Sequence, residues 1–289
     1  MNFHEILHVM AHAALDSLKL LPFLFFTYLL MELLEHKAGD GVKKAISRAG
    51  RLGPLLGALL GLVPQCGFSA LAAGLYAARI VTPGTVLAVF LATSDEMIPV
   101  LLGAGLGVPR VLTILAIKLT VALICGFALD LLLARRVEPE HVGDFCDGEH
   151  CHCEQGVLRS SIHHTLHVFG FVLVINLALS FLVELVGADA MGEWMRSLPV
   201  LGEVIAALVG LIPNCAASVA IATLYARGVI SAGAMLAGLL AGSGAGLLVL
   251  FRTNRPMREN LLFVAALLLI GAGFGVLLEL TGLGGVLLP

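Results

Sequence analysis

The stretch GLVPQCGFSALAAGLYA begins at Gly61, and a second version of it, GLIPNCAASVAIATLYA, begins at Gly210. Each copy places a proline, an amide side chain and a cysteine in the middle of an otherwise apolar segment, starting at Pro64 in the first and at Pro213 in the second. Proline interrupts a helix because it lacks an N–H and clashes with the preceding turn. The pattern therefore predicts a helix that is interrupted at the same point of two related segments.

The two stretches belong to a longer internal repeat. Residues 52–101 match residues 201–250 at 21 of 50 positions, with a constant offset of 149 and no gap. Roughly four or five matches are expected by chance, so the segment is duplicated. We therefore divide the chain into a first membrane repeat, residues 1–135, a polar linker, residues 136–158, and a second membrane repeat, residues 159–289.

Composition places the chain in a membrane. It is 59% hydrophobic, has a mean hydropathy of +1.00 and is only 13% charged, which is too little charge for the surface of a soluble domain of 289 residues. Long apolar runs, at 20–34, 111–133, 168–186 and 261–280, have the length that spans a bilayer. We expect an all-α polytopic membrane protein. The N-terminus lacks a cationic stretch before a small-residue cleavage site, so we expect no signal peptide.

Each repeat also contains a pair of shorter helical segments around its proline. They cover about 52–63 and 66–80 in the first repeat, and about 201–212 and 215–228 in the second. Segments of this length are too short to cross the membrane alone. Each pair is therefore either one broken spanning helix or a re-entrant hairpin whose tip lies near the middle of the membrane.

The distribution of Lys and Arg favours the hairpin. Each half then has three spanning helices and a hairpin, about ten helical segments in all, and the second repeat has inverted topology. Twelve cations lie on one side and three on the other, against 10 and five for broken spanning helices. We predict that both termini lie outside and that the linker is cytosolic. The cation-bearing segments predicted on the cytosolic side are 35–51, the loop at Arg79, 135–159 and 252–258.

Inverted repeats with interrupted helices are typical of secondary transporters. Irregular backbone at membrane depth is tolerated only where protein buries it or where it lines a wet cavity. The interrupted ends present unpaired N–H and C=O groups, which can bind ions. A pair of proline kinks that serves packing alone is the alternative. Both copies add a hydroxyl three residues after the cysteine, Ser69 and Ser218, which favours a binding site.

Two acidic residues lie in the apolar segment that follows the first hairpin. Asp95 and Glu96 occur in LATSDEMIPV, with apolar residues on both sides. Charges at that depth indicate an ion path or a buried partner, although a pair that caps a helix at the interface is the alternative. The second copy keeps Ser243 but has Gly244 and Ala245 in place of the acids. This asymmetry predicts a single site between the repeats.

Lys118 lies in the next apolar run. Its side chain could extend along the helix to the membrane surface, as long cationic side chains do, or it could pair with Asp95 or Glu96. The sequence favours the first interpretation. Under the second, a carboxylate would alternate between a metal and the ammonium, so these three residues are candidates for proton coupling or charge compensation.

The candidate metal ligands are polar side chains at the interruptions and in the acidic motif. Thiols together with carboxylates and amides suit a borderline divalent transition metal. Oxygen ligands alone would suit Mn²⁺, whereas paired thiolates would favour Zn²⁺, Cd²⁺ or trivalent arsenic. An arsenite site would need a third thiol, and Cys125 has the character of an ordinary buried residue. The predicted ligands are Gln65, Cys66, Ser69, Thr93, Ser94, Asp95, Glu96, Asn214, Cys215 and Ser218.

The linker has a metal-binding composition, EPEHVGDFCDGEHCHCEQG over residues 138–156. Three thiols and two imidazoles fall within eight residues, but their spacing matches no zinc finger. We predict a flexible chelating loop that senses or delivers metal; a merely solvated linker is the alternative. The predicted linker ligands are Cys146, His150, Cys151, His152 and Cys153.

Each repeat also begins with a helix face that carries two histidines at i, i+4 spacing. They could receive metal as auxiliary ligands, or they could simply be solvated at a helix end. The residues are His8, His12, His163 and His167.

Four motifs resemble one family: GLVPQCGFS from Gly61, LATSDEMIPVLL from Leu91, GLIPNCAAS from Gly210 and SGAGLLVLFRTN from Ser243. With the His/Cys-rich loop between the halves, they are similar to the bacterial ten-helix heavy-metal exporters, whose members are labelled arsenic efflux protein or manganese transporter. The resemblance covers nearly the whole chain. It implies an exporter of a heavy metal in the bacterial inner membrane.

The sequence thus predicts a secondary-active exporter of a transition metal, with manganese favoured, that works by alternating access and proton exchange. Arsenite or soft-metal efflux through the same site is one alternative, and a metal-dependent intramembrane enzyme is another. Duplicated hairpins and the absence of a P-loop or GxSxG motif favour a transporter without a bound cofactor. The expected partners are the metal ion and the bilayer. A net charge of −3 gives no sign of nucleic-acid binding, and a homo-oligomer stays open.

Overall fold

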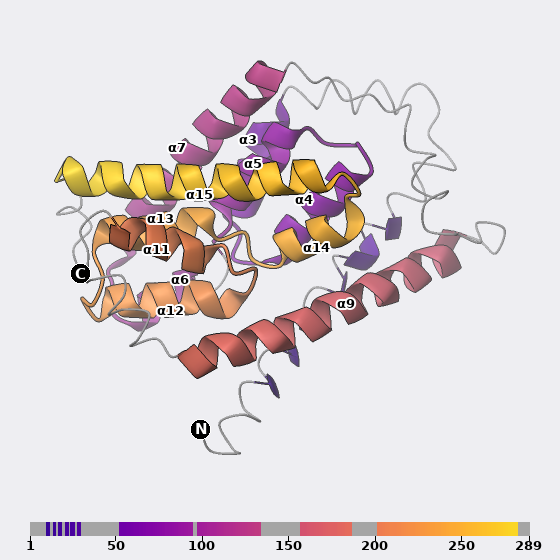
Figure 1. The fold of residues 1–289 in the computed structure, drawn as a ribbon, viewed down its shortest axis with the longest axis horizontal. Helices are drawn as coiled ribbons and strands as arrows, with labels where there is room; N and C mark the ends of the chain where they lie inside the picture. Colours follow the sequence, from indigo (N-terminus) through magenta and orange to yellow (C-terminus); the bar gives the residue numbers. More distant parts are fainter. Residues whose placement is uncertain are drawn as a thin grey trace.

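The computed structural model of the chain describes residues 52–94, 97–133, 157–186 and 201–282, together with scattered positions between 10 and 29. The described residues form helices and connecting turns, with no strand (Figure 1). Leucines on these helices are widely exposed, for example 83% for Leu131 and 82% for Leu132, as expected of a surface that faces lipid. The prediction of an all-α polytopic membrane protein is confirmed. Candidate spans are Pro83–Gly103, Val108–Leu133, Ser161–Ala178, Ala232–Thr253 and Met257–Leu280.

The helices of the second half repeat those of the first. When the first set is shifted by 149 residues, its bounds agree with those of the second set within two residues. The first set is α3 (Gly53–Gly61), α4 (Gly67–Ala77), α5 (Pro83–Ala92), α6 (Met97–Gly103) and α7 (Val108–Leu133). The second is α11 (Leu201–Gly210), α12 (Cys215–Ala226), α13 (Ala232–Ala241), α14 (Gly246–Thr253) and α15 (Met257–Leu280), preceded by α9 (Val157–Val186).

Polar residues fix where several of the short helices begin. Thr82 caps α5, Ser231 caps α13 and Asn214 caps α12. Their side-chain oxygens accept hydrogen bonds from backbone N–H groups at 3.1, 3.1 and 2.8 Å, respectively. Such caps satisfy N–H groups that have no partner inside the helix. The chain therefore leaves one helix and enters the next at defined points, even though the flanking residues are apolar.

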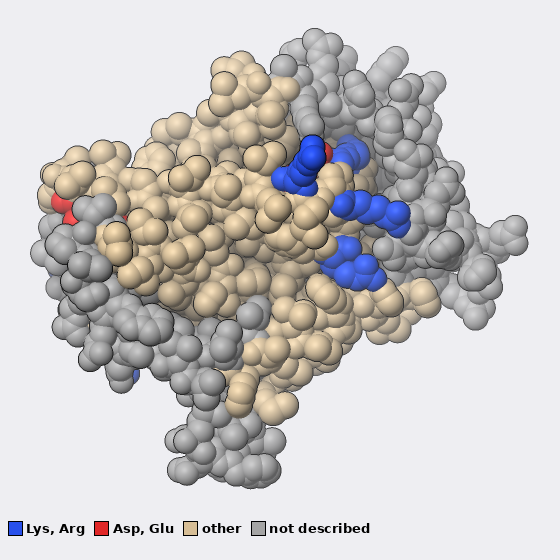
Figure 2. Space-filling view, in the orientation of Figure 1, with Lys and Arg blue, Asp and Glu red and all other residues tan. Residues whose placement is uncertain are grey.

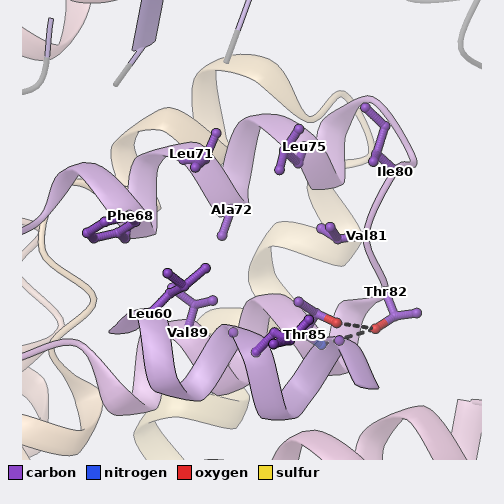
Figure 3. Close-up of a pocket in the computed structure, with 13 residues that line it drawn as sticks. Leu60, Phe68, Leu71, Ala72, Leu75, Ile80, Val81, Thr82, Thr85 and Val89 are labelled. Atoms are coloured by element: carbon purple, nitrogen blue, oxygen red, sulfur yellow. Dashed lines mark hydrogen bonds between the residues drawn. The ribbon is translucent and has the colours of Figure 1, made fainter. Parts of the chain in front are cut away.

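The first pair of short helices forms a hairpin. Helices α3 and α5 run parallel, because Gly53 lies against Thr85 at one end and Gly61 lies against Val89 at the other. Helix α4 runs back beside them, and the three helices enclose an apolar cavity of about 220 Å³ (Figure 3). The lining is almost wholly apolar, so this larger cavity does not suit an ion.

The second pair has the same arrangement. Helices α11 and α13 also run parallel: Glu203 lies 3.5 Å from Ser231 at their first turns, and Gly210 lies against Gly238 further along. Helix α12 connects them, as α4 connects α3 to α5. A helix of ten residues is only about 15 Å long, roughly half the thickness of the hydrocarbon core. Each pair is therefore a short hairpin packed against the following helix.

An ion pair between the halves favours one of the two topologies that the sequence left open. The guanidinium of Arg79, which follows α4, lies 2.8 Å from a carboxylate oxygen of Glu259 at the start of α15. The hydroxyl of Tyr76 donates to the same oxygen at 2.8 Å. If α3 and α4 were one spanning helix, Arg79 and Glu259 would lie on opposite sides of the membrane. The contact contradicts that alternative.

Charge is distributed unevenly along the molecule. Figure 2 shows Lys and Arg side chains gathered where α14 passes into α15, the segment that carries Arg252, Arg255 and Arg258. Acidic side chains appear near the far end of α15 in the same view. The loop at Arg79 and residues 252–258 thus share one end, as the positive-inside pattern predicts.

The helix that follows each hairpin is broken, an interruption that the apolar pattern of the sequence does not predict. In the apolar segment that follows the first hairpin, α5 ends at Ala92 and α6 begins at Met97. The matching break separates α13 from α14. At equivalent positions Thr93 and Gly242 adopt extended ψ angles of 122° and 113°. In the first half the Thr93 hydroxyl bonds the Val89 carbonyl, and such local bonds compete with regular helix.

Reversing the charge of Arg79 tests the contact between the halves. Arg79→Glu is expected to lower the melting temperature, since it places two carboxylates together, and Glu259→Arg is expected to do the same. The double exchange, Arg79→Glu with Glu259→Arg, should recover most of the loss. Thermal unfolding of the purified protein in detergent measures all three variants. If the double variant melts no higher than the worse single one, the two side chains do not pair in the membrane protein.

Candidate functional site

Each hairpin packs against the broken helix of the other half. Helix α4 lies beside α14, and α12 lies beside α6 (Figure 1). The first contact is close: a Cβ placed on Gly246, at the start of α14, would lie 2.8 Å from Cβ of Ser69. In the second contact Met97, the equivalent of Gly246, borders a cavity together with Ser218, the equivalent of Ser69. Each repeat therefore packs its hairpin against the other repeat, and the two contacts are related by the repeat.

The junction of α12 and α6 contains a small cavity. About 10 Å³ is open to the centre of a water-sized sphere, which is room for one ion or one water molecule. Both halves contribute to its walls, and three of the predicted ligands, Thr93, Asn214 and Ser218, meet there. The full lining is Thr93, Met97, Gly210, Asn214, Ser218, Gly238, Leu239, Gly242 and Gly244.

The polar groups of this cavity are arranged to accept rather than to donate. The Thr93 hydroxyl donates its hydrogen to the Val89 carbonyl at 2.8 Å, and the Ser218 hydroxyl donates to the Cys215 carbonyl at 2.8 Å. With their hydrogens committed, both oxygens offer only lone pairs to a guest. Helix α11 ends at Gly210 and α13 ends just before Gly242, so two carbonyl ends add partial negative charge. Such a lining suits a cation.

Asn214 holds the tip of the second hairpin in place. Its side-chain oxygen accepts the Ala216 N–H at 2.8 Å, and its amide nitrogen donates to the Asn176 carbonyl of α9 at 3.2 Å. The amide nitrogen of Asn176 in turn donates to the Ser17 hydroxyl at 2.9 Å. Asn214 therefore joins the tip to α9 and, through it, to Ser17.

Lys118 does not extend to the membrane surface. Its side chain is fully buried, and its ammonium group donates to the backbone carbonyl of Leu239. Leu239 also lines the small cavity. The preference for an extended, surface-reaching Lys118 was therefore wrong. The physical reason is that α7 packs along α5 inside the molecule, so that this face of α7 is enclosed by protein. The Lys118 side chain thus reaches Leu239, a residue of the cavity wall.

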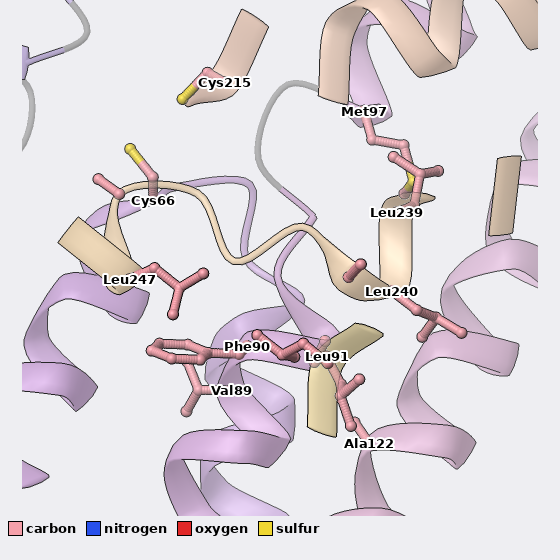
Figure 4. Close-up of a cluster of buried hydrophobic side chains, with 14 of the residues drawn as sticks. Cys66, Val89, Phe90, Leu91, Met97, Ala122, Cys215, Leu239, Leu240 and Leu247 are labelled. Carbon is pink, nitrogen blue, oxygen red and sulfur yellow. The ribbon is translucent and has the colours of Figure 1, made fainter. Parts of the chain in front are cut away.

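The two hairpin cysteines occupy equivalent places at the hairpin tips. Cys66 is 7% exposed and Cys215 is 8% exposed, and neither forms a disulfide. Figure 4 draws their sulfurs toward the space between the two hairpin tips. The predicted ligands Gln65 and Ser69 belong to the first hairpin, where the Ser69 hydroxyl donates to the Cys66 carbonyl at 2.7 Å. Ser94 is buried at the break that follows α5 and donates to the Ala92 carbonyl.

Several predicted site residues lie outside the described part of the chain. They are Asp95, Glu96, His8, His12, Cys146, His150, Cys151, His152 and Cys153. His163 and His167 are described, and both are exposed near the start of α9. Within the described residues, no group of three or more His, Cys, Asp or Glu side chains gathers to hold a metal.

Ser243 is a site residue that the ligand prediction left out. It is 1% exposed, and its hydroxyl has no hydrogen-bond partner. It lies between Gly242 and Gly244, both of which line the small cavity. The signal in the sequence was the pairing of Ser94 with Ser243 in the repeat. A buried hydroxyl without a partner is costly, so Ser243 is a further candidate ligand.

The fold and the cavity agree with a comparison against protein families. Residues 6–191, which are nearly two thirds of the chain, match the family model described as "Putative, 10TM heavy-metal exporter". The chain belongs to this family. The match includes the first hairpin, the acidic motif, the linker and α9, and it confirms the resemblance inferred from the motifs. Neither the curated proteins nor the solved structures contain a match.

Family membership implies a transporter rather than an enzyme. The N-terminus nevertheless carries an HExxH sequence, His4 to His8 (HEILH), the pattern in which two histidines on one helical face bind zinc in metalloproteases. These residues lie outside the described part of the chain. The motif includes His8, one of the predicted auxiliary ligands.

Proposed function

We propose that this heavy-metal exporter moves a divalent transition metal, with manganese favoured, out of the cytosol through the small cavity between its two halves. The observation that carries the proposal is a pair of hydroxyl oxygens in that cavity, Thr93 and Ser218, which come from different repeats and whose hydrogens are already donated to backbone carbonyls. Oxygen ligands favour Mn²⁺ over softer metals. Asp95 and Glu96, two and three residues after Thr93, would add the negative charge that a divalent ion needs.

The helices support an inverted arrangement of the two halves. A hairpin enters and leaves on the same side, so each half would cross three times: once before its hairpin, once through its broken helix and once through α7 or α15. An odd number of crossings reverses the second half relative to the first. With the arginine-rich end cytosolic, both termini lie outside, the linker lies in the cytosol, and the protein resides in the bacterial inner membrane.

Transport would follow from rocking of the two halves around the cavity. Each hairpin contacts the broken helix of the other half, so movement of one half changes both junctions together. The ammonium of Lys118, which contacts the Leu239 carbonyl, supplies positive charge that replaces the charge of the metal. When the metal leaves, the ammonium and protons compensate Asp95 and Glu96; when metal binds, they are displaced. Export is thereby coupled to proton entry, and the linker cysteines and histidines would deliver the metal from the cytosol.

Soft-metal or arsenite efflux remains the second candidate because of the two buried thiols. Cys66 and Cys215 sit at equivalent hairpin tips and point toward a shared space (Figure 4). Two thiolates would suit a soft metal such as Cd²⁺, and trivalent arsenic would need a third thiol beside them. The two functions differ in the residues that they need.

A metal-challenge experiment separates them. A host that lacks its own exporters would carry the wild type, Asp95→Asn/Glu96→Gln, or Cys66→Ser/Cys215→Ser, and would be grown with Mn²⁺, Zn²⁺, Cd²⁺ or arsenite. We expect protection against Mn²⁺ that disappears with the acids and survives loss of the thiols. Protection against Cd²⁺ or arsenite that disappears with the thiols would replace manganese by a soft metal. No protection, with unchanged cell metal content, would refute export.

A further inference from the structure

Glu203 is a buried carboxylate that neither the fold nor the central cavity explains. It lies in the first turn of α11 and is only 4% exposed. One oxygen lies 3.5 Å from the Ser231 hydroxyl, and the other is buried with no hydrogen-bond partner. Within the described residues, no cation pairs with it. A buried carboxylate without a positive partner is strongly unfavourable, so this oxygen is suited to take up a cation.

Two helix N-termini and a second carboxylate lie close to Glu203. Glu203 lies at the N-terminus of α11 and beside the N-cap of α13, where the partial positive charges of two helices favour an anion. A second carboxylate approaches the same turn: an oxygen of Glu279 lies 2.9 Å from the place where Gly233 would carry a Cβ. Gly233 thus leaves room for this group. Two carboxylates and the hydroxyl of Ser231 surround the first turn of α13.

Among the described residues, the corresponding helix start of the first half has no buried carboxylate without a partner. There Asp130, near the end of α7, accepts the Thr82 hydroxyl at 2.7 Å and the Gly84 N–H at 2.8 Å, so both of its oxygens are satisfied. The position equivalent to Glu203 is Pro54. Asp130 therefore closes the start of α5 as a structural cap. The unpaired carboxylate is particular to the second half.

Glu203 and Glu279 lie at the end of the molecule opposite the Arg79–Glu259 ion pair. Helix α15 begins at that pair, and Glu279 comes twenty residues later, about 30 Å along the helix axis. Glu203 and the cavity residue Gly210 are seven residues apart on α11, about 10 Å along its axis. On the proposed topology, on which this inference rests, this is the outer end. It is where an exported ion leaves.

We infer that Glu203, Glu279 and Ser231 form a second, outer binding site for the exported divalent cation. Oxygen ligands alone select hard or borderline ions such as Mn²⁺. Because the described residues provide two carboxylates and a hydroxyl here, water completes the coordination shell and binding is weaker than in the central cavity. A weak site next to the exit draws the ion outward and releases it readily.

Titration of the purified full-length protein in detergent with Mn²⁺ tests this inference. Electron paramagnetic resonance reports the free aqueous ion, so the decrease in signal counts bound ions. The wild type should show a tight class and a weak class of sites. Glu203→Gln should weaken the weak class at least about tenfold, as loss of a charged ligand does, and should leave the tight class unchanged. Asp95→Asn/Glu96→Gln should weaken the tight class and leave the weak class unchanged.

Asp130→Asn is the matched control, since it removes a carboxylate from the start of the corresponding broken helix. This variant should keep the tight and the weak class of Mn²⁺ sites. Its melting temperature should fall, because Asp130 accepts hydrogen bonds from Thr82 and Gly84. Glu203→Gln should not lower the melting temperature, because it removes a buried unpaired charge. A Glu203→Gln protein that titrates like the wild type would overturn the outer site. Failure of the metal-challenge experiment with an intact weak class would instead refute export and leave the outer site standing.

Discussion

Replacing Lys118 by methionine is expected to reduce metal export about 100-fold or more while the protein stays folded. Methionine keeps most of the buried volume but removes the ammonium that contacts the Leu239 carbonyl at the wall of the cavity. In the proposed exchange, the acidic motif then loses the ammonium that compensates it after the metal leaves. An uncompensated buried charge is worth several kcal/mol, and each 1.4 kcal/mol changes a rate about tenfold. Initial rates of Mn²⁺ efflux from preloaded cells measure the effect.

The conservative variant Lys118→Arg gives the control. It retains the positive charge, so export should fall less than in Lys118→Met, although the bulkier guanidinium fits the enclosed site poorly. Amount in the membrane and elution as a single species in detergent confirm folding. If Lys118→Met exports at the wild-type rate, the ammonium serves packing alone and the exchange mechanism fails.

Gly210→Ala is expected to abolish export and to destabilise the second hairpin. A Cβ at Gly210 would lie 2.0 Å from the backbone oxygen of Gly238, which is far inside van der Waals contact. Backbone cannot rotate away, so α11 and α13 must separate. Overpacking of this kind costs about 1–3 kcal/mol or more. Both glycines line the small cavity, so the same displacement changes the cation site. Thermal unfolding and Mn²⁺ efflux check the two effects.

Gly273→Ala is the matched control within a helix. A Cβ at this position of α15 meets no atom within 4 Å. Alanine favours helix over glycine by about 0.5–1 kcal/mol, so this variant should keep its export rate and melt slightly higher than the wild type. Equal behaviour of the Gly210 and Gly273 variants would mean that the close approach of α11 and α13 is absent from the protein in its membrane.

Much of the fold follows from sequence because repetition and charge are strong signals. The offset of 149 residues identified the corresponding helices, and the prolines at 64 and 213 located the hairpin tips. The hairpin itself was an inference from counting cations, and the contact between Arg79 and Glu259 supports it. Local rules therefore located the interruptions, and a long-range contact was needed to tell a hairpin from a broken helix.

The broken helices were harder to predict because their interruptions contain no proline. In the second half, Gly242 and Gly244 are residues that favour a break in a helix. In the first half, the break depends on hydroxyls such as Thr93 that bond their own backbone, which a hydropathy pattern does not register.

The site could be predicted only in part, because its residues come from both halves. Thr93, Asn214 and Ser218 were predicted as ligands and do meet at one cavity. The buried state of Lys118 depends on how α7 packs, and the unpaired Ser243 hydroxyl depends on the geometry of a break. Neither can be obtained from spacing along the chain. The burial of Glu203 also depends on tertiary packing, because its sequence neighbours give no sign that it is enclosed.

Proton-coupled movement of Mn²⁺ in proteoliposomes tests the central claim most directly. The purified protein would be reconstituted in liposomes that contain a Mn²⁺-sensitive dye, with Mn²⁺ outside and an acidic interior. Our account predicts that Mn²⁺ enters while protons leave, that the flux stops when the pH gradient is removed, and that Asp95→Asn/Glu96→Gln abolishes it. Wild-type liposomes that admit no Mn²⁺ under any pH gradient, or an acid-free variant that transports it normally, would contradict the account.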